Sequence, residues 1–470
     1  MDATRIPLSR WAILGLLLAI AAGAGLRLIW RLDIEYKFDE EWTFERVQKA
    51  GVDEPWPTLG PPTSAGPLNP ALNIWVFIGM SKLFGVTDPP GVACVVESMS
   101  IAALVLLAFF AIRYVPPPQR ELWLWAVALM ALNPFAVIYH RKIWQPCLFP
   151  LFTSGFLIAW WYRRRPLGAF MAGLIGCLMG QIHLAGWMFA AGFFFWGLLF
   201  DRQSLAAWKW CLAGILLGCV PMIPWFEYLA AGPTEPPTGI QQSSVENIWS
   251  GKFWFHWITQ PLGLTIQYVL GHDFVDFLRY PLIAGHPTYL VGALYLCLAA
   301  TVSWTAARAV TYLWHERRRI GQILIGRDGP TEFATAACLW GFGIVMTLTA
   351  IKIHRHYMLV AMPLIFTWLA SIILARPKGV AGVEQGGEIP ASDKDPRAMP
   401  TALRGHARDA TPVWTPGRLC LLALCVIQGL LSASMLGYIH TNQRYINGDF
   451  RVPYGAQIQA AGERAERGGE

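Results

Sequence analysis

Long runs of apolar residues alternate with short polar segments along most of the chain. A helix that crosses the hydrocarbon core of a membrane needs roughly 20 mainly apolar residues. By this measure the pattern predicts eleven spans, at 11–30, 92–112, 121–139, 144–162, 167–182, 184–200, 206–225, 288–308, 333–350, 357–375 and 417–437. Very short connections at Tyr139–Ile143 and Gln181–His183 predict two tight hairpins. The expected fold class is therefore an all-α polytopic membrane protein.

Basic clusters mark one side of these predicted spans. The charged connections on that side are Arg163–Arg165, Asp201–Arg202, Arg317–Arg319 and Arg376–Lys378. Lys and Arg are enriched in the cytoplasmic loops of membrane proteins. This side is therefore predicted to be cytoplasmic and to carry the N-terminus.

The same pattern divides the chain into a core, a linker and a C-terminal part. Residues 1–375 are predicted to form the transmembrane core, with outer loops at 32–91 and 226–287. Residues 376–416 are polar and lack helical periodicity, so we expect a flexible cytoplasmic linker there. Residues 417–470 supply the last span and a tail on the outer side.

The segment 68–85 decides this orientation. It is short and contains Asn69, Asn73 and Lys82 among its apolar residues. We therefore expect a helix lying at the outer interface rather than a further span. If it crossed the membrane, every later connection would change sides.

Composition supports a lipid-embedded protein. Of the 470 residues, 55% are hydrophobic and 14% are charged, against about 25% charged in soluble domains. The net charge of +7 comes from short clusters between apolar runs, which does not indicate nucleic-acid binding. Most of the nine cysteines lie inside apolar runs, where packed thiols are more common than metal ligands.

The strongest chemical candidate follows the first predicted span, where Tyr36–Trp42 reads Tyr-Lys-Phe-Asp-Glu-Glu-Trp. Three consecutive carboxylates, Asp39, Glu40 and Glu41, repel one another, so at least one is expected to have a raised pKa. A carboxylate at a membrane–water boundary can act as a general base on a sugar hydroxyl. A solvated acidic loop without chemistry is the alternative interpretation.

Two basic turns are predicted on the same outer side, where such clusters are unexpected. One contains His140, Arg141 and Lys142, and the other runs from Lys352 to Tyr357. A phosphate just outside the hydrocarbon would be a suitable partner, because Arg binds it bidentately. The alternatives are basic side chains that extend to the interface, or pairing with the acidic loop. The lone His183 at a helix end is more often structural than functional.

Four segments, taken together, resemble the GT-C superfamily of membrane glycosyltransferases, and most closely the glycosyltransferase family 39 clan. They are the acidic pair Asp39–Glu40, the stretch Gly66–Gly85, the turn Tyr139–Trp144 and the segment His356–Pro363. The match departs from the usual pattern at Asn69, Glu41, His140, Lys142 and Trp144. These departures leave the substrate open.

The resemblance implies a GT-C-like bundle with a non-cytoplasmic loop layer, in the plasma (inner) membrane with the active site on the outer face. The donor would be a sugar on a polyprenyl phosphate. The acceptor would be a hydroxyl on a lipid, glycan or protein. Asp39 would be the general base of an inverting transfer, with Glu40 orienting the acceptor or Asp39. Metal use varies among family members, and no ligand spacing here demands a divalent cation.

The remaining implied roles concern binding. The residues expected to hold the donor lipid phosphate are Arg141, Lys142, His354, Arg355, His356 and Tyr357. The residues expected to contact substrate are Glu41, His140 and His183.

Two other functions remain open at this point. A transporter or flippase of lipid-linked sugars would be expected to carry ionisable residues in mid-span, and few are evident between residues 92 and 225. An assembly protein without catalysis has no specific feature in its favour.

Overall fold

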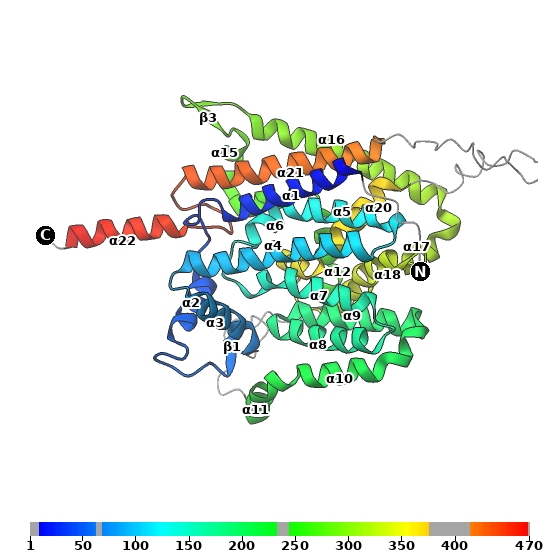
Figure 1. Ribbon diagram of the computed structural model, residues 1–470. Coiled ribbons are helices and arrows are strands. Elements are labelled where there is room, and N and C mark those ends of the chain that lie inside the picture. Colours follow the sequence, from blue (N-terminus) through cyan, green and yellow to red (C-terminus); the bar gives the residue numbers. More distant parts are fainter. Residues whose placement is uncertain (1–8, 63–67, 233–243, 376–413, 469–470) are drawn as a thin grey trace, which may run out of the picture.

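The computed structural model describes residues 9–62, 68–232, 244–375 and 414–468, and a bundle of helices dominates it (Figure 1). The bundle contains α1 (Arg10–Leu28), α4 (Pro89–Tyr114), α5 (Pro117–Leu132), α6 (Pro134–Tyr139), α7 (Phe149–Trp161), α8 (Pro166–Ile182), α9 (Leu184–Phe200), α10 (Trp208–Gly218), α16 (Leu290–His315), α18 (Pro330–Ala336), α19 (Gly343–Leu348), α20 (Leu364–Leu374) and α21 (Pro416–Thr441). Smaller elements connect these helices.

The connecting helices are α2 (Phe38–Lys49), α3 (Leu72–Phe84), α11 (Ile223–Ala231), α12 (Val245–Trp249), α13 (Lys252–Thr259), α14 (Ile266–Leu270), α15 (Phe274–Leu278), α17 (Ile320–Ile325) and α22 (Tyr454–Gly468). Short 3-10 turns are η1 (Gln145–Leu148), η2 (Arg202–Ala207), η3 (Val220–Met222), η4 (Gly271–Asp273), η5 (Arg317–Arg319) and η7 (Arg355–Ala361), and η6 (Ala337–Phe342) is a π-helix. Two small antiparallel pairs join β1 (Leu59–Pro62) to β2 (Leu68–Pro70) and β3 (Leu282–Ile283) to β4 (His286–Pro287).

Local sequence explains where many helices begin. The side chains of Ser9, Asp88, Asn133 and Thr415 accept hydrogen bonds from the first free N–H groups of α1, α4, α6 and α21, as good N-caps do. Proline occupies the first turn of many helices, because its missing N–H would have no helical partner there. Small residues then let helices approach closely: a Cβ on Gly192 of α9 would lie 2.3 Å from the backbone nitrogen of Phe342.

The outer surface of the bundle is apolar. Leu17, Leu216, Leu296 and Val310 are each more than half exposed, on long helices that leave these side chains without protein partners. Among the described residues, six helices are long and apolar enough to cross a membrane, or seven if the bent pair η7 and α20 forms one span. The chain is a multi-pass helical membrane protein.

The count of eleven continuous spans is not confirmed. The predicted span 121–139 is broken at Asn133-Pro134 into α5 and α6, because proline removes a helical N–H. The predicted span 144–162 starts with the turn η1, and 357–375 bends by 79° between η7 and α20. Both α8 and α9 are 17-residue apolar helices, joined by the predicted tight turn at His183.

The two ends of the bundle differ. The beginning of α1 and the helix α17 lie at one end, whereas α2, α3, β1, β3 and α22 lie at the other (Figure 1). The segment predicted to be interfacial contains α3, whose 13 residues would span only about 20 Å. It packs beside α2 and α4. Of the predicted linker 376–416, residues 376–413 lie outside the described part of the chain.

Candidate active site

The acidic motif forms the first turn of α2. Helix α2 begins at Phe38, so Asp39, Glu40 and Glu41 lie where the helix dipole favours negative charge. Consecutive helical side chains diverge by about 100°. As a result Glu40 is only 2% exposed, whereas Asp39 and Glu41 remain exposed.

A buried lysine faces this acidic segment. The Lys142 ammonium forms an ion pair with Glu35, which also pairs with Lys37. Lys142 lies 4.7 Å from the centre of the Tyr139 ring. Burial alone would lower the pKa of Lys142, but the carboxylates of Glu35 and Glu40 raise it above its ordinary value. The lysine is therefore a firmly held positive charge.

The two carboxyl groups of the predicted pair have different environments. Burial, together with the negative charge of Glu35, raises the pKa of Glu40 to about 8. Among the described residues, its Oε2 atom has no hydrogen-bond partner. Partial loss of hydration also raises the pKa of Asp39, although the positive charge of Lys37 and the nearby Trp144 side chain oppose this effect. Glu40 thus keeps its proton to a higher pH than an ordinary glutamic acid, beside a more accessible Asp39.

Aromatic contacts connect the acidic pair to three histidines. The Trp144 ring lies 4.6 Å from the His356 ring, which lies 5.6 Å from His183 and 5.5 Å from His354. Tyr357 lies 5.2 Å from His183. Trp144 therefore lies between Asp39 and ring side chains from the turn between α8 and α9, from η7 and from the residue before η7.

Arg355 is held at the edge of this cluster. Its Nε atom donates a hydrogen bond to the Tyr139 hydroxyl at 3.2 Å, and its guanidinium lies 4.6 Å from the Tyr268 ring centre. The same guanidinium forms an ion pair with Asp449 from the segment after α21. Arg355 is thus already used as an anion-binding residue within the chain.

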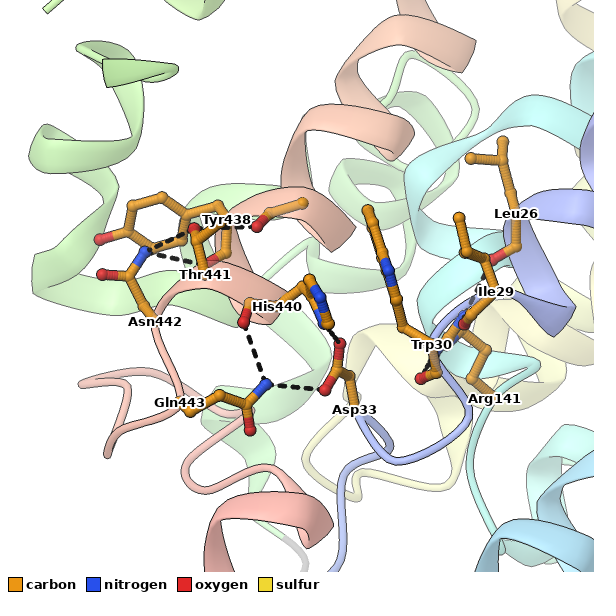
Figure 2. A network of polar contacts seen from close by, with 11 residues as sticks. Leu26, Ile29, Trp30, Asp33, Arg141, Tyr438, His440, Thr441, Asn442 and Gln443 are labelled. Atoms are coloured by element: carbon orange, nitrogen blue, oxygen red, sulfur yellow. Dashed lines mark hydrogen bonds and ion pairs between the residues drawn. The ribbon is translucent and has the colours of Figure 1, made fainter. Parts of the chain in front are cut away.

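Two neighbours in the Tyr139–Trp144 turn are used differently. Arg141 is 1% exposed and donates hydrogen bonds of 2.7–3.1 Å to the carbonyls of Leu26, Arg27, Ile29 and Trp30 at the end of α1. Figure 2 shows Arg141 beside Ile29 and Trp30, just after the end of α1. A helix end leaves carbonyls without helical partners, and Arg141 supplies donors for them.

His140 is also directed into the bundle. It is fully buried, with its Nδ1 atom 2.6 Å from the Ser100 hydroxyl and 3.1 Å from a guanidinium nitrogen of Arg27. These contacts place both side chains inside the bundle. We therefore leave both residues out of the proposed substrate site.

Several residues of the cluster were not among the predicted site residues. Glu35 was one of many acidic residues in its loop, and Trp144 stood out only as a departure from the family pattern. Tyr268 and Asp449 had no local signal. Among the described residues, no group of three or more His, Cys, Asp or Glu side chains is arranged to hold a metal ion.

No protein-family model matches the chain, and no curated protein matches it. Among solved structures, the chain is similar to an archaeal oligosaccharyltransferase, AglB from Archaeoglobus fulgidus, in complex with an inhibitory peptide and a dolichol-phosphate. This likeness has a TM-score of 0.43 and 14% identity, and it covers 91% of this chain and 56% of that chain. The apo form of the oligosaccharyltransferase from the same organism gives a TM-score of 0.44 and 13% identity, with coverage of 91% and 56%. The chain spans little more than half the length of these proteins, and a likeness at this identity and score does not establish a function.

Proposed function

We propose that this chain is a membrane glycosyltransferase that moves a sugar from a polyprenyl-phosphate donor to a hydroxyl acceptor on the non-cytoplasmic face. One observation carries the proposal: Asp39 and Glu40 lie together with Lys142, Trp144 and the histidine cluster. The segments that contribute them are far apart in the sequence. The motifs that resemble those of the GT-C superfamily support the same function.

In this proposal Asp39 is the general base. Its carboxylate is the accessible member of the pair, and it accepts the proton of the acceptor hydroxyl as that oxygen attacks the anomeric carbon. Glu40 is buried and protonated, and it orients Asp39 or the acceptor. Attack opposite the lipid phosphate inverts the anomeric centre. The bond between the anomeric carbon and the phosphate oxygen breaks, and the lipid phosphate leaves as an anion.

The leaving phosphate needs fixed positive charge. Of the predicted donor-binding residues, we retain Lys142, His354, Arg355, His356 and Tyr357. Lys142 and Arg355 supply this charge, and the rings of His354, His356 and Tyr357 supply hydrogen-bond donors. Groups already held in place cost little reorganisation as negative charge develops on the leaving group. We also propose that His183 and Glu41 contact substrate. The outer-face location follows from the basic clusters predicted at the opposite side of the bundle.

Replacement of Asp39 tests the proposal. Asp39→Asn removes the proton acceptor and keeps the shape of the side chain, so transfer should fall by at least about 100-fold. The measurement is mass spectrometry of envelope glycans and lipids from cells that lack the gene and carry either the wild-type or the variant chain. The product that appears with the wild-type chain should be missing with Asp39→Asn.

Glu45→Gln is the matched control, because Glu45 lies on the same helix α2, is exposed and pairs with Lys49. It should support wild-type product. Both variants should reach the membrane in equal amounts by fluorescence-detected size-exclusion chromatography. Wild-type transfer by Asp39→Asn would remove Asp39 from the catalytic role.

A transporter or flippase of lipid-linked sugars is the second candidate, and one observation favours it. Arg27, Glu97 and Ser100 are buried on α1 and α4, and such groups inside a membrane bundle often mark transport paths. The Arg27 guanidinium, however, donates to the carbonyls of Gly23 and Ala131 at 2.8 and 2.7 Å. With purified chain, donor and acceptor, a transferase would form a new glycoside, whereas a flippase would move the lipid-linked sugar without forming one.

A further inference from the structure

The segment between α21 and α22 returns to the candidate active site. We call residues 442–453 the C-terminal strap. It lies between the segment that precedes α2 and the elements α14 and η4, and it places Asp449 against Arg355. Its contacts explain how a tail near the end of the chain reaches the site.

The strap is tied down where it leaves α21. Asp33 accepts hydrogen bonds of 2.7 Å from both His440 and Gln443, and the His440 ring stacks on Trp30 with centroids 4.4 Å apart. Figure 2 shows Asp33 between these two partners. The start of the strap is therefore bound to Asp33, in the loop between α1 and the acidic motif.

The middle of the strap is a turn fixed on α14 and η4. The backbone N–H groups of Asp449 and Phe450 donate to the carbonyls of Tyr268 and Val269 at 3.1 and 3.2 Å. A Cβ added to Gly448 would lie 2.2 Å from the Val269 carbonyl oxygen. Only a glycine allows this close approach, so the backbone holds Asp449 in one position.

Asp449 then makes two contacts at the site. Its carboxylate pairs with Arg355, whose side chain is 13% exposed, while the Asp449 side chain is 53% exposed. Its carbonyl accepts a hydrogen bond of 2.5 Å from Lys37, which also pairs with Glu35. The strap thus connects Arg355 to the ion pair of Lys37 and Glu35, which lies close to Glu40.

A carboxylate and a phosphate bind a guanidinium through the same N–H groups. Arg355 therefore cannot keep Asp449 while it binds a phosphate through those groups. We propose that the C-terminal strap is an intramolecular competitor that closes the Arg355 anion site and is displaced when a phosphate-bearing donor binds. This inference rests on the proposed function, in which Arg355 receives the donor phosphate.

Linkage between the two states makes the effect measurable. If closure and phosphate binding exclude each other, any change that opens the strap increases phosphate affinity, and bound phosphate opens the strap in return. An ion pair with a half-exposed partner contributes up to about 1 kcal/mol, which corresponds to about two- to fivefold in affinity.

Binding to the full-length chain in nanodiscs tests the proposal, with undecaprenyl phosphate as the probe. Asp449→Asn should bind the probe about two- to fivefold more tightly than the wild type. Gly448→Ala lifts the turn without changing a charge and should also bind more tightly. Asp276→Asn is the control, because Asp276 forms an exposed pair with Arg279, and it should bind as the wild type does.

The pattern of failure separates this inference from the proposed function. If both Asp449→Asn and Gly448→Ala bound undecaprenyl phosphate with wild-type affinity, the proposed competition by the strap would be overturned. If Arg355→Ala still weakened binding, the donor site would stand without it. If Arg355→Ala bound undecaprenyl phosphate as tightly as the wild type, the donor site itself would be contradicted. In the Arg355→Ala background, Asp449→Asn should have no further effect.

Two further probes identify the anion. If Asp449→Asn increased the affinity for inorganic phosphate as well as for undecaprenyl phosphate, the Arg355 site would recognise the phosphate group itself. If only the affinity for undecaprenyl phosphate increased, the Arg355 site would also require the lipid chain. If the affinity increased only for vesicles of phosphatidylglycerol, the proposal would be overturned, because the Arg355 site would then bind bulk anionic lipid.

Discussion

At the residue scale, neighbouring carboxyl groups differ because a helix turns them in different directions. Glu40 faces the buried ion pair of Glu35 and Lys142, whereas Asp39 faces the more open side with Trp144. The sequence predicted that at least one of three adjacent acids would have a raised pKa. It could not identify Asp39 and Glu40 as the affected groups, because burial depends on the packing of α2.

These environments predict a bell-shaped dependence of the transfer rate on pH. Asp39 must be ionised to accept a proton, so activity should rise as pH increases through its raised pKa. Glu40 has a pKa of about 8. Above that pH it loses the proton with which it orients Asp39 or the acceptor, so activity should fall again.

The variant Glu40→Gln should lose only the alkaline fall. The amide still donates a hydrogen bond but does not titrate near pH 8. The measurement is the initial transfer rate from pH 5 to 10, with Glu45→Gln as the control that keeps the wild-type profile. An unchanged alkaline limb in Glu40→Gln would assign that limb to another group.

At the element scale, the Tyr139–Trp144 turn shows how one basic motif is divided among several tasks. Lys142 and Trp144 face the acidic segment, while His140 and Arg141 point into the bundle and hold α1. The sequence predicted the turn and its side of the membrane. It treated the adjacent cations alike, because the carbonyls that Arg141 binds are more than a hundred positions away.

This division predicts that Arg141 supports stability rather than donor binding. Arg141→Ala leaves buried carbonyls at the end of α1 without donors and should lower the free energy of unfolding by about 2–4 kcal/mol. Chemical unfolding in detergent would measure the loss. Arg113→Ala, at an exposed position at the end of α4, is the control and should change stability little.

Binding of undecaprenyl phosphate to the folded Arg141→Ala protein should stay near the wild-type affinity. A stable variant with greatly weakened binding would instead return Arg141 to the phosphate site.

At the scale of the whole molecule, the end that carries α2, α3 and the strap lies opposite the end that carries α17 (Figure 1). The charge bias of the connections predicted two such sides before any helix was placed. The hydrophobic pattern overestimated the number of continuous spans, because a run of apolar residues does not reveal a break inside it. Residues of the candidate site lie where short elements meet: Lys142 and Trp144 lie between α6 and η1, and Arg355 begins η7.

The proposed orientation can be tested by labelling with a membrane-impermeant maleimide. Val52→Cys lies in the exposed loop after α2, and Arg318→Cys lies in η5 at the other end. On intact cells Val52→Cys should react, whereas Arg318→Cys should react only after the membrane is disrupted. The wild-type chain is the blank, since Cys297 is exposed. The opposite result would place the acidic motif in the cytoplasm.

The sequence by itself determined the mostly helical, membrane-embedded class and predicted which segments share one side. Hydropathy and charge bias are local properties, because the partition of each segment between lipid and water depends on the composition of that segment. Only the tertiary structure decided which charged side chains serve the site. Glu35, Trp144 and Asp449 acquire partners from distant segments, and Arg141 is taken up by the carbonyls of α1. The physical reason is that a buried charge is defined by the partners packed around it, and packing is a property of the whole chain.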